Sequence, residues 1–173
     1  MATNVEKLRE KLEQLKNPGS GKFSRKTWKP KKGGEKSKIR LIDYPFSEDN
    51  FVELWFHYGI GNGPGILCLN RNYGRSCPIC DFARSLNDTG EEKDKELAKT
   101  LWPKQRVYAV VIDREDSKPT PKYWGFGVQV YTKLIESLLN SQTGHMLNTA
   151  KGIDMTIWSE KKNKKMFPET DFI

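Results

Sequence analysis

One histidine and all three cysteines of the chain lie within a single stretch, HYGIGNGPGILCLNRNYGRSCPIC (57–80). Their spacing is H-x10-C-x8-C-x2-C, and the four residues are His57, Cys68, Cys77 and Cys80. Three thiolates and one imidazole suit a single tetrahedral zinc ion, and a Cys-x-x-Cys pair is spaced to bind one metal. Because this set leaves no ligand position for water, it predicts one structural zinc ion and not a catalytic one.

Other interpretations of these residues stay open. A Cys-x-x-Cys pair also occurs in redox motifs. Cys68 can be a small buried hydrophobic residue and His57 an ordinary residue of a strand. An odd number of cysteines argues against a disulfide framework, and reduced cysteines fit a cytosolic protein.

The positive charge of the chain is concentrated at its N-terminal end. The net charge is +8, but residues 1–40 hold thirteen Lys or Arg and four Glu, and the rest of the chain is close to neutral. A basic arm on a near-neutral body predicts a polyanionic partner, with nucleic acid the leading candidate. The alternative is a solvated cationic tail. We expect an arm over 1–38 and one domain over 39–173.

The arm begins with a predicted amphipathic helix over 4–16 and continues into a basic stretch. The apolar residues of the helix are Val5, Leu8, Leu12 and Leu15. An isolated helix this short needs a surface to pack on, either its own body or a second copy. The basic stretch mixes lysines with Phe23 and Trp28, a composition that suits base stacking and phosphate binding, or a linker anchored by Trp28.

From Ile39 onward the sequence predicts mainly strands. The expected strands are 39–42, 51–58, 66–69, 106–112, 123–128 and 152–159, with helices at 81–86, 96–101 and 130–140 and loops at 87–95 and 113–121. Gly125 and Gly127 predict a close backbone approach or a bulge. The fold class is mainly β with α insertions, and a small barrel similar to an OB-fold, with a structural zinc subdomain inserted after the second strand, is the best match.

The candidate nucleic-acid contacts are cations and aromatic residues of the arm, the zinc loop and the later strands. Aromatic rings stack on bases while nearby cations bind the phosphates. The candidates are Lys29, Lys31, Lys32, Arg71, Tyr73, Arg75, Arg106, Tyr108, Trp124 and Phe126.

The sequence shows no catalytic constellation, because it has no H-E-x-x-H helix, no Ser-His-Asp arrangement and no H-x-E pattern at His57. A binding protein is therefore expected and not an enzyme. A zinc-containing adaptor that docks on replication or transcription machinery is the alternative function, and a zinc-dependent nucleic-acid enzyme is a weaker one. No apolar run has the length of a membrane span, and the N-terminus lacks the pattern of a signal peptide.

From Trp28 to Ser159 the chain resembles the gene 32 single-stranded DNA-binding proteins of T-even-like bacteriophages. The resemblance rests on the first strand Ile39-Arg40-Leu41, on the zinc loop ending in Ser-Cys-Pro-Ile-Cys (76–80), on the strand 107–112 and on Lys-Tyr-Trp-Gly-Phe-Gly (122–127). Two features differ from the family. Arg106 and Tyr108 stand near the position of a family aromatic, and only 168–173 corresponds to the long acidic C-terminal segment. Either those residues are a short version of it, or the sequence is part of a longer chain.

The resemblance implies an OB-fold core with structural Zn²⁺ that binds single-stranded DNA without sequence preference. It implies cooperative self-association through the N-terminal segment, here Val5, Leu8, Leu12 and Leu15. The expected role is to coat and protect single strands in phage replication, recombination and repair. The expected partners are single-stranded DNA, further copies of the chain and replication proteins such as a polymerase or helicase loader. The expected location is the cytoplasm of an infected bacterium.

Overall fold

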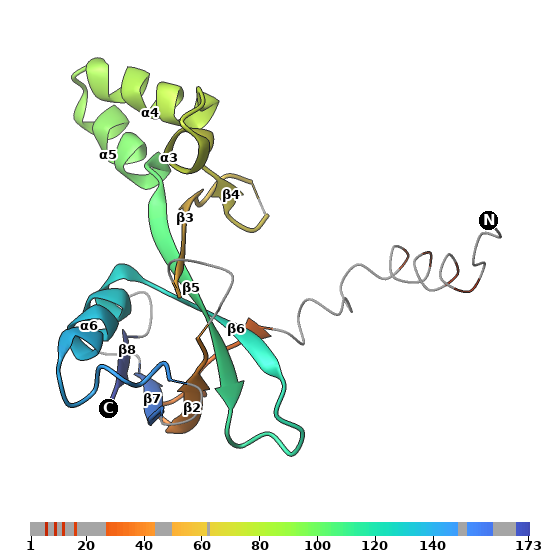
Figure 1. Ribbon diagram of the computed structural model, residues 1–173. Coiled ribbons are helices and arrows are strands. Elements are labelled where there is room, and N and C mark those ends of the chain that lie inside the picture. The colour runs from red at the N-terminus through yellow and green to blue at the C-terminus, as the bar shows by residue number, and fades with distance from the viewer. Residues whose placement is uncertain are drawn as a thin grey trace. The chain divides into compact units, whose positions relative to one another are not determined.

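The structure is a computed structural model that describes residues 6, 9, 12, 16, 27–43, 50–61, 63–148, 152–160 and 169–173 (Figure 1). The chain divides into two units. The first unit comprises Met1–Leu41, Val110–Trp124 and Asp154–Ile173, and the second comprises Ile42–Ala109 and Gly125–Ile153. Two strands, β5 (Lys104–Asp113) and β6 (Pro121–Phe126), run through both units.

The first unit is a mixed sheet in the strand order β1-β6-β5-β2-β7-β8. Its own strands are β1 (Thr27–Trp28), β2 (Ser37–Leu41), β7 (Asp154–Glu160) and β8 (Glu169–Phe172). The β1–β6 pair is parallel, and β2 pairs antiparallel with both β5 and β7. Alternate residues point to one face, and the buried ones are Trp28, Ile39, Leu41, Val111, Trp124, Met155 and Ile157.

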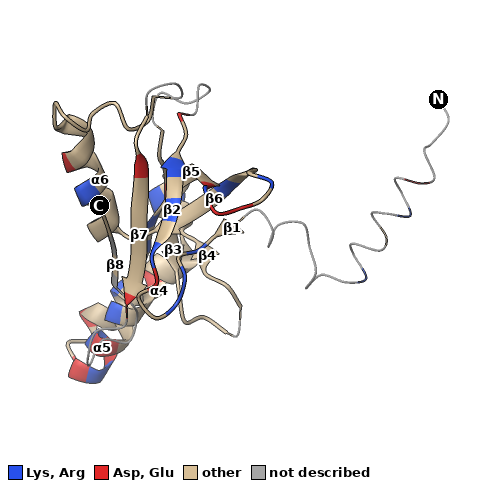
Figure 2. Ribbon diagram, turned by 90° about the horizontal axis from the view of Figure 1, so that it is seen from below, with Lys and Arg blue, Asp and Glu red and all other residues tan. Residues whose placement is uncertain are grey.

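Charged residues meet where the acidic first residue of β7, an interior strand, lies beside basic residues of its neighbours (Figure 2). The carboxylate of Asp154 accepts from Nε of Arg40 at 2.6 Å and from Nε of Arg114 at 3.2 Å. Burial alone would raise the pKa of Asp154, but the two guanidinium groups outweigh it and lower the pKa. These contacts add ion pairs to the backbone pairing of β2 with β7 and connect β7 to the residue that follows β5.

The second unit combines a short antiparallel ladder with helices. Strand β3 (Val52–His57) pairs with β4 (Ile66–Leu67) and with the first part of β5. The helices are α3 (Leu69–Tyr73), α4 (Pro78–Asp88), α5 (Glu92–Leu101) and α6 (Val128–Leu139). Helices α4 and α5 pack against each other, with the small residues Cys80, Ala83 and Ala98 on their buried sides. Small side chains let the two backbones approach closely.

Most predicted strands and helices of the body are confirmed, with their ends shifted by a few residues. The prediction of a loop over 87–95 is wrong, because α4 extends to Asp88 and α5 begins at Glu92, leaving a short turn with Gly90 at φ 81°. Three short elements, β1, α3 and β8, were not predicted. They hold two to five residues each, too few to show a hydrophobic period.

The predicted N-terminal helix is described only at Glu6, Arg9, Leu12 and Lys16, which are helical and exposed. Val5, Leu8 and Leu15, and the basic KKNKK stretch at 161–165, lie outside the described residues. Among the described strands, the pairings form a mixed sheet with helices and do not close into a ring. No helix within the described residues is long and apolar enough to cross a membrane.

Candidate metal centre and the aromatic face above it

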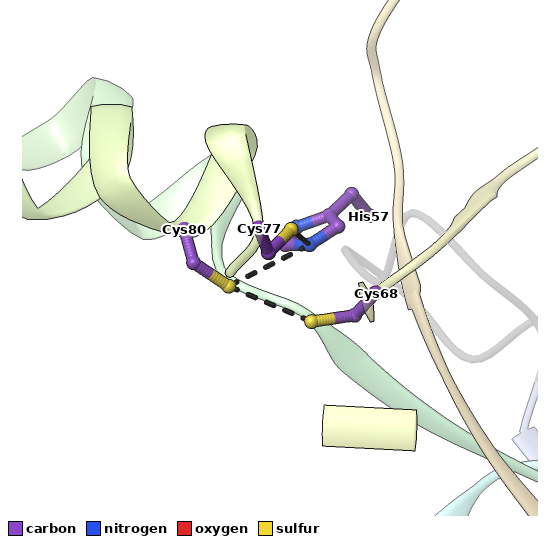
Figure 3. A group of neighbouring side chains, drawn as sticks. All are labelled: His57, Cys68, Cys77 and Cys80. Carbon is purple, nitrogen blue, oxygen red and sulfur yellow. Dashed lines mark hydrogen bonds between the residues drawn. The ribbon is translucent and has the colours of Figure 1, made fainter. Parts of the chain in front are cut away.

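The four predicted ligands form one buried cluster in the second unit. Figure 3 shows the three sulfur atoms and the imidazole of His57 turned toward one another. His57 and Cys68 have no exposed surface, Cys77 is 2% exposed and Cys80 is 5% exposed. Their donor atoms all lie within 4.8 Å of one another. The sequence prediction that these four side chains meet is therefore confirmed.

The separations between the donor atoms fit a tetrahedral metal site. Sγ of Cys68 and Sγ of Cys80 are 3.5 Å apart, and Nε2 of His57 is 3.4 Å from Sγ of Cys77 and 3.7 Å from Sγ of Cys80. Zn–S bonds of about 2.3 Å give tetrahedral S–S edges of about 3.8 Å. A disulfide would need sulfurs about 2.05 Å apart, and all three cysteines are free. The donor set can therefore hold one metal ion with little rearrangement.

A single hydrogen bond orients the histidine. Nδ1 of His57 lies 2.7 Å from the carbonyl oxygen of Leu101, at the end of α5. A carbonyl only accepts, so Nδ1 carries the proton and Nε2 presents its lone pair to the three sulfurs. The tautomer required for metal binding is thus set by the backbone of α5.

Asn72 joins the cysteine loop to strand β3. Its Nδ2 donates to the carbonyl oxygens of Trp55 and Cys68, both at 2.8 Å, and its Oδ1 accepts from the backbone N–H of Trp55 at 3.0 Å. The backbone N–H of Cys68 also donates to Trp55 O at 2.9 Å.

Cys68 caps α3 by accepting from the N–H of Arg71 at 3.4 Å. Helix α3 then ends at Gly74, whose φ of 64° favours glycine.

The second pair of cysteines belongs to the start of α4. Cys77 is its N-cap, followed by Pro78, and Cys80 lies in the first turn. Burial opposes ionisation of Cys77, but hydrogen bonds from the backbone of Cys80, Leu69 and Ile79 outweigh it and lower its pKa to about 6. Burial and the neighbouring Cys68 and Cys77 raise the pKa of Cys80 to about 12. At neutral pH and without metal, Cys77 is therefore a thiolate and Cys80 keeps its proton.

The opposite face of β3 holds aromatic and basic residues. Antiparallel pairing places Val52, Leu54 and Phe56 beside Tyr108, Arg106 and Lys104 of β5. Successive residues of a strand point to opposite faces, so Phe56 lies on the far side of β3 from Trp55 and His57. Trp55 packs on the cysteine cluster. One strand thus presents a metal ligand on one face and an aromatic residue on the other.

Phe56, Tyr58 and Tyr108 form a continuous row of half-buried rings, here called the aromatic row. The ring centroid of Phe56 lies 6.1 Å from that of Tyr58 and 6.5 Å from that of Tyr108. Arg106 lies beside the row, and its Nη2 donates to the carbonyl oxygen of Gly125 at 3.0 Å. Burial raises the pKa of Tyr58, and the charge of Arg106 partly offsets that rise. The row and one cation therefore share a single surface.

The predicted nucleic-acid contacts have different surroundings. Arg106 and Tyr108 lie together at the row, as just described. On α3, Tyr73 is 58% exposed, and the guanidinium of Arg71 stacks over Trp55 at 5.1 Å from the ring centroid. Exposed side chains also include Lys29, Lys31, Lys32 and Arg75, of which Lys31 pairs with Glu115 at 2.6 Å.

Two of the predicted contacts do not fit the structure. Trp124 is 1% exposed and Phe126 is 3% exposed, so both rings belong to the core and have no free face for a base. They alternate inward along β6, and the ring edge of Trp124 packs against Trp28 with the centroids 5.6 Å apart. The alternation of 121–126 gave no sign of which face is buried, because both faces hold aromatic residues.

Sequence reasoning missed Phe56, Tyr58 and Asn72. Phe56 and Tyr58 flank His57, so the period of two that turns His57 inward turns both rings outward. That signal is present in the sequence. The role of Asn72 depends on a helix of five residues, which the sequence indicates only through the C-terminal Gly74.

No protein-family model matches the chain, and a comparison with curated proteins finds no match.

Asn72→Ala is expected to weaken metal binding without changing any ligand. The substitution leaves backbone groups of Trp55 and Cys68 without their side-chain partners, which lowers the free energy of unfolding by about 1–3 kcal/mol. Loss of such an outer contact typically costs about 10–100-fold in metal affinity. Competition with a chelator and thermal unfolding measure the two effects. Asn70→Ala is the matched control, since its exposed side chain lies on the same helix; equal behaviour of the two variants would contradict the role of Asn72.

Zinc affinity is expected to rise with pH. Ligand thiols must lose their protons on binding, and Cys80, with a pKa near 12, is protonated at neutral pH. Each proton displaced makes the apparent affinity rise by roughly tenfold per pH unit. Below about pH 6 Cys77 is also protonated, so the dependence becomes steeper there. Chelator competition from about pH 5 to about pH 8 checks this, and an affinity independent of pH would refute it.

Proposed function

We propose that the protein binds single-stranded DNA without sequence preference and that a structural zinc ion holds the binding surface in shape. The aromatic row is the main support. Phe56, Tyr58 and Tyr108 lie side by side on one face of the ladder, with Arg106 next to them. Rings stack on any base, because every base has a π-face, and an adjacent guanidinium binds phosphate. Such a surface needs unpaired bases and does not read their identity.

The charge of the chain supports the same proposal. Residues 1–40 are strongly basic, and Lys29 and Lys32 are exposed among the described residues. Cations of this kind bind phosphates through release of counterions, which makes the affinity strongly dependent on salt. In this proposal the arm supplies affinity, and the aromatic row supplies the preference for single strands.

Zinc would be held by His57, Cys68, Cys77 and Cys80. A closed set of three thiolates and one imidazole gives folding free energy and no open position for catalysis. Because His57 lies between Phe56 and Tyr58 in sequence, the metal would fix the end of β3, which carries Phe56 and is followed directly by Tyr58. The proposed zinc is therefore structural, and the protein acts as a binding protein and not as an enzyme.

The finer assignments follow from the resemblance to the gene 32 proteins. We propose an OB-fold-like core, cooperative self-association through the N-terminal segment that contains Leu12, and a role in coating and protecting single strands during phage replication, recombination and repair. Replication proteins such as a polymerase or helicase loader are proposed partners, and the cytoplasm of an infected bacterium is the proposed location. The exposed Leu12 supports a helix that packs on another surface.

A zinc-containing adaptor is the second candidate. The zinc-loop region and its helices expose several large apolar side chains, and exposed apolar surface is a feature of protein interfaces. These side chains are Leu69, Phe82, Leu97 and Trp102. The adaptor requires no affinity for single strands, so the experiment below separates the two functions.

The protein is expected to bind a fluorescently labelled oligo-dT more tightly than a duplex of equal length, with an affinity that falls steeply as salt is raised. Fluorescence anisotropy at two salt concentrations measures this. Label anisotropy is preferable to tryptophan quenching, because none of the five tryptophans belongs to the aromatic row. Equal binding of duplex would indicate the basic arm alone, and absence of binding would leave the adaptor.

Within the same assay, Tyr58→Leu and Tyr108→Leu are each expected to weaken oligo-dT binding by about 5- to 150-fold, since one stacked base contributes about 1–3 kcal/mol. Tyr123→Leu is the matched control. That tyrosine is 50% exposed but belongs to the other unit and not to the row. If all three variants bind as the wild type does, the row is not the binding surface.

A further inference from the structure

Gly65 and Gly125, in the second unit, lie at positions where the backbone conformation does not require glycine. The described glycines with positive φ are Gly33, Gly34, Gly59, Gly61, Gly74 and Gly90. Gly65 and Gly125 are not among them, so any residue can adopt their backbone conformation. Gly125 lies within strand β6 and Gly65 directly precedes β4, positions where glycine weakens a strand or allows a close approach.

The space above each of these glycines is filled by a ring of the aromatic row. A Cβ on Gly65 would lie 2.6 Å from Cε1 and 3.0 Å from Cδ1 of Tyr58. A Cβ on Gly125 would lie 2.8 Å from Cε1 and 3.2 Å from Cδ1 of Tyr108. Carbon atoms in contact are normally about 3.5–4.0 Å apart. Each tyrosine ring therefore lies against bare backbone, and a methyl group at either glycine would displace it.

Neighbouring glycines lack this property. A Cβ on Gly63, in the same loop as Gly65, would meet nothing within 4 Å. A Cβ on Gly127, two residues after Gly125, would only reach Nη1 of Arg106 at 3.9 Å, an ordinary contact. Of the glycines from Gly59 to Gly144, only Gly65 and Gly125 would bring a Cβ within 3 Å of an aromatic ring; a Cβ on Gly144 would meet backbone oxygens instead. The carbonyl of Gly125 also accepts from Arg106, so this one residue contacts both a ring and the cation beside it.

We propose that Gly65 and Gly125 are positioning residues for base stacking: by lacking a Cβ, they hold the rings of Tyr58 and Tyr108 against the backbone in the orientation that receives unpaired bases. The proposal rests on the proposed function, because it concerns how the aromatic row binds a single strand. Rings already held in place lose little conformational freedom on binding. The expected ligand is therefore a strand that has bases, and a bare sugar-phosphate chain would gain nothing from these glycines.

Gly65→Ala and Gly125→Ala test the proposal, with Gly63→Ala and Gly127→Ala as matched controls. Binding of oligo-dT and of an abasic strand of the same length is measured at one salt concentration, after thermal unfolding has confirmed that each variant folds. Gly65→Ala and Gly125→Ala are expected to weaken oligo-dT binding on the order of tenfold, the loss of about one stacked base. Binding of the abasic strand and both control variants should stay at the wild-type level.

The Tyr108→Leu background shows whether Gly125 acts through the ring. There, adding Gly125→Ala should have almost no further effect on oligo-dT binding, because the ring that it positions is gone. The contact between ring and glycine also has a spectroscopic signature in the wild-type protein. The ring currents of Tyr58 and Tyr108 should shift the Hα resonances of Gly65 and Gly125 upfield. Tyr58→Leu should abolish the shift at Gly65, and Tyr108→Leu should abolish the shift at Gly125. This signature needs no glycine variant to fold.

Several results would overturn the proposal. Equal losses for oligo-dT and the abasic strand would mean that the glycines only support the fold. Oligo-dT binding that is unchanged in Gly65→Ala and Gly125→Ala, or an absent ring-current shift, would mean that the rings are not held in this way. If the wild type itself binds oligo-dT no better than the abasic strand, base stacking at the row fails, and the proposed function fails with it.

Discussion

The period of two along strand β3 is the constraint on which the site depends. His57 must point inward to complete the cluster with Cys68, Cys77 and Cys80, and its Nδ1 donates to Leu101 O at 2.7 Å. Because neighbours on a strand point to opposite faces, this orientation turns Phe56 outward on the ladder. The ligand cluster and the aromatic row therefore depend on the same side-chain alternation along β3. Neither can shift along the strand without disturbing the other.

The small buried volume of this region explains why a metal would be needed. The core around the cluster consists of the three cysteines with Trp55 and Ile79 packed against them, and helices α4 and α5 bury little more than Cys80, Ala83 and Ala98. Few buried apolar side chains give little hydrophobic stabilisation. Metal coordination by the cluster would supply folding free energy that such a core lacks. Two hydrogen bonds between Asn72 and the backbone of Trp55 then connect the loop to β3, and a third, to Cys68 O, lies within the loop.

The sequence predicted the metal cluster well because ligand type and spacing are local and specific. It also predicted the longer strands of the mixed sheet, because these strands show clear periods. It did not predict α3, because five residues contain too little pattern, and it placed Trp124 and Phe126 at the interface although both are buried. Which of two aromatic faces is covered depends on contacts between distant strands. The contact between the Tyr108 ring and Gly125 likewise joins residues that only the tertiary structure brings together. The glycine alone predicted a close approach to the backbone at this position but not which residue makes it.

The most direct test of the account is to withdraw zinc gradually with a chelator while following metal content and oligo-dT affinity in the same samples. Affinity should fall in step with bound metal, because loss of the proposed zinc ion would free His57 and with it the strand that orients the aromatic row. The loss should be larger for oligo-dT than for an abasic strand, whose phosphates the basic arm still binds. Full oligo-dT affinity in metal-free protein would contradict the account, since the row would then form without the cluster beneath it.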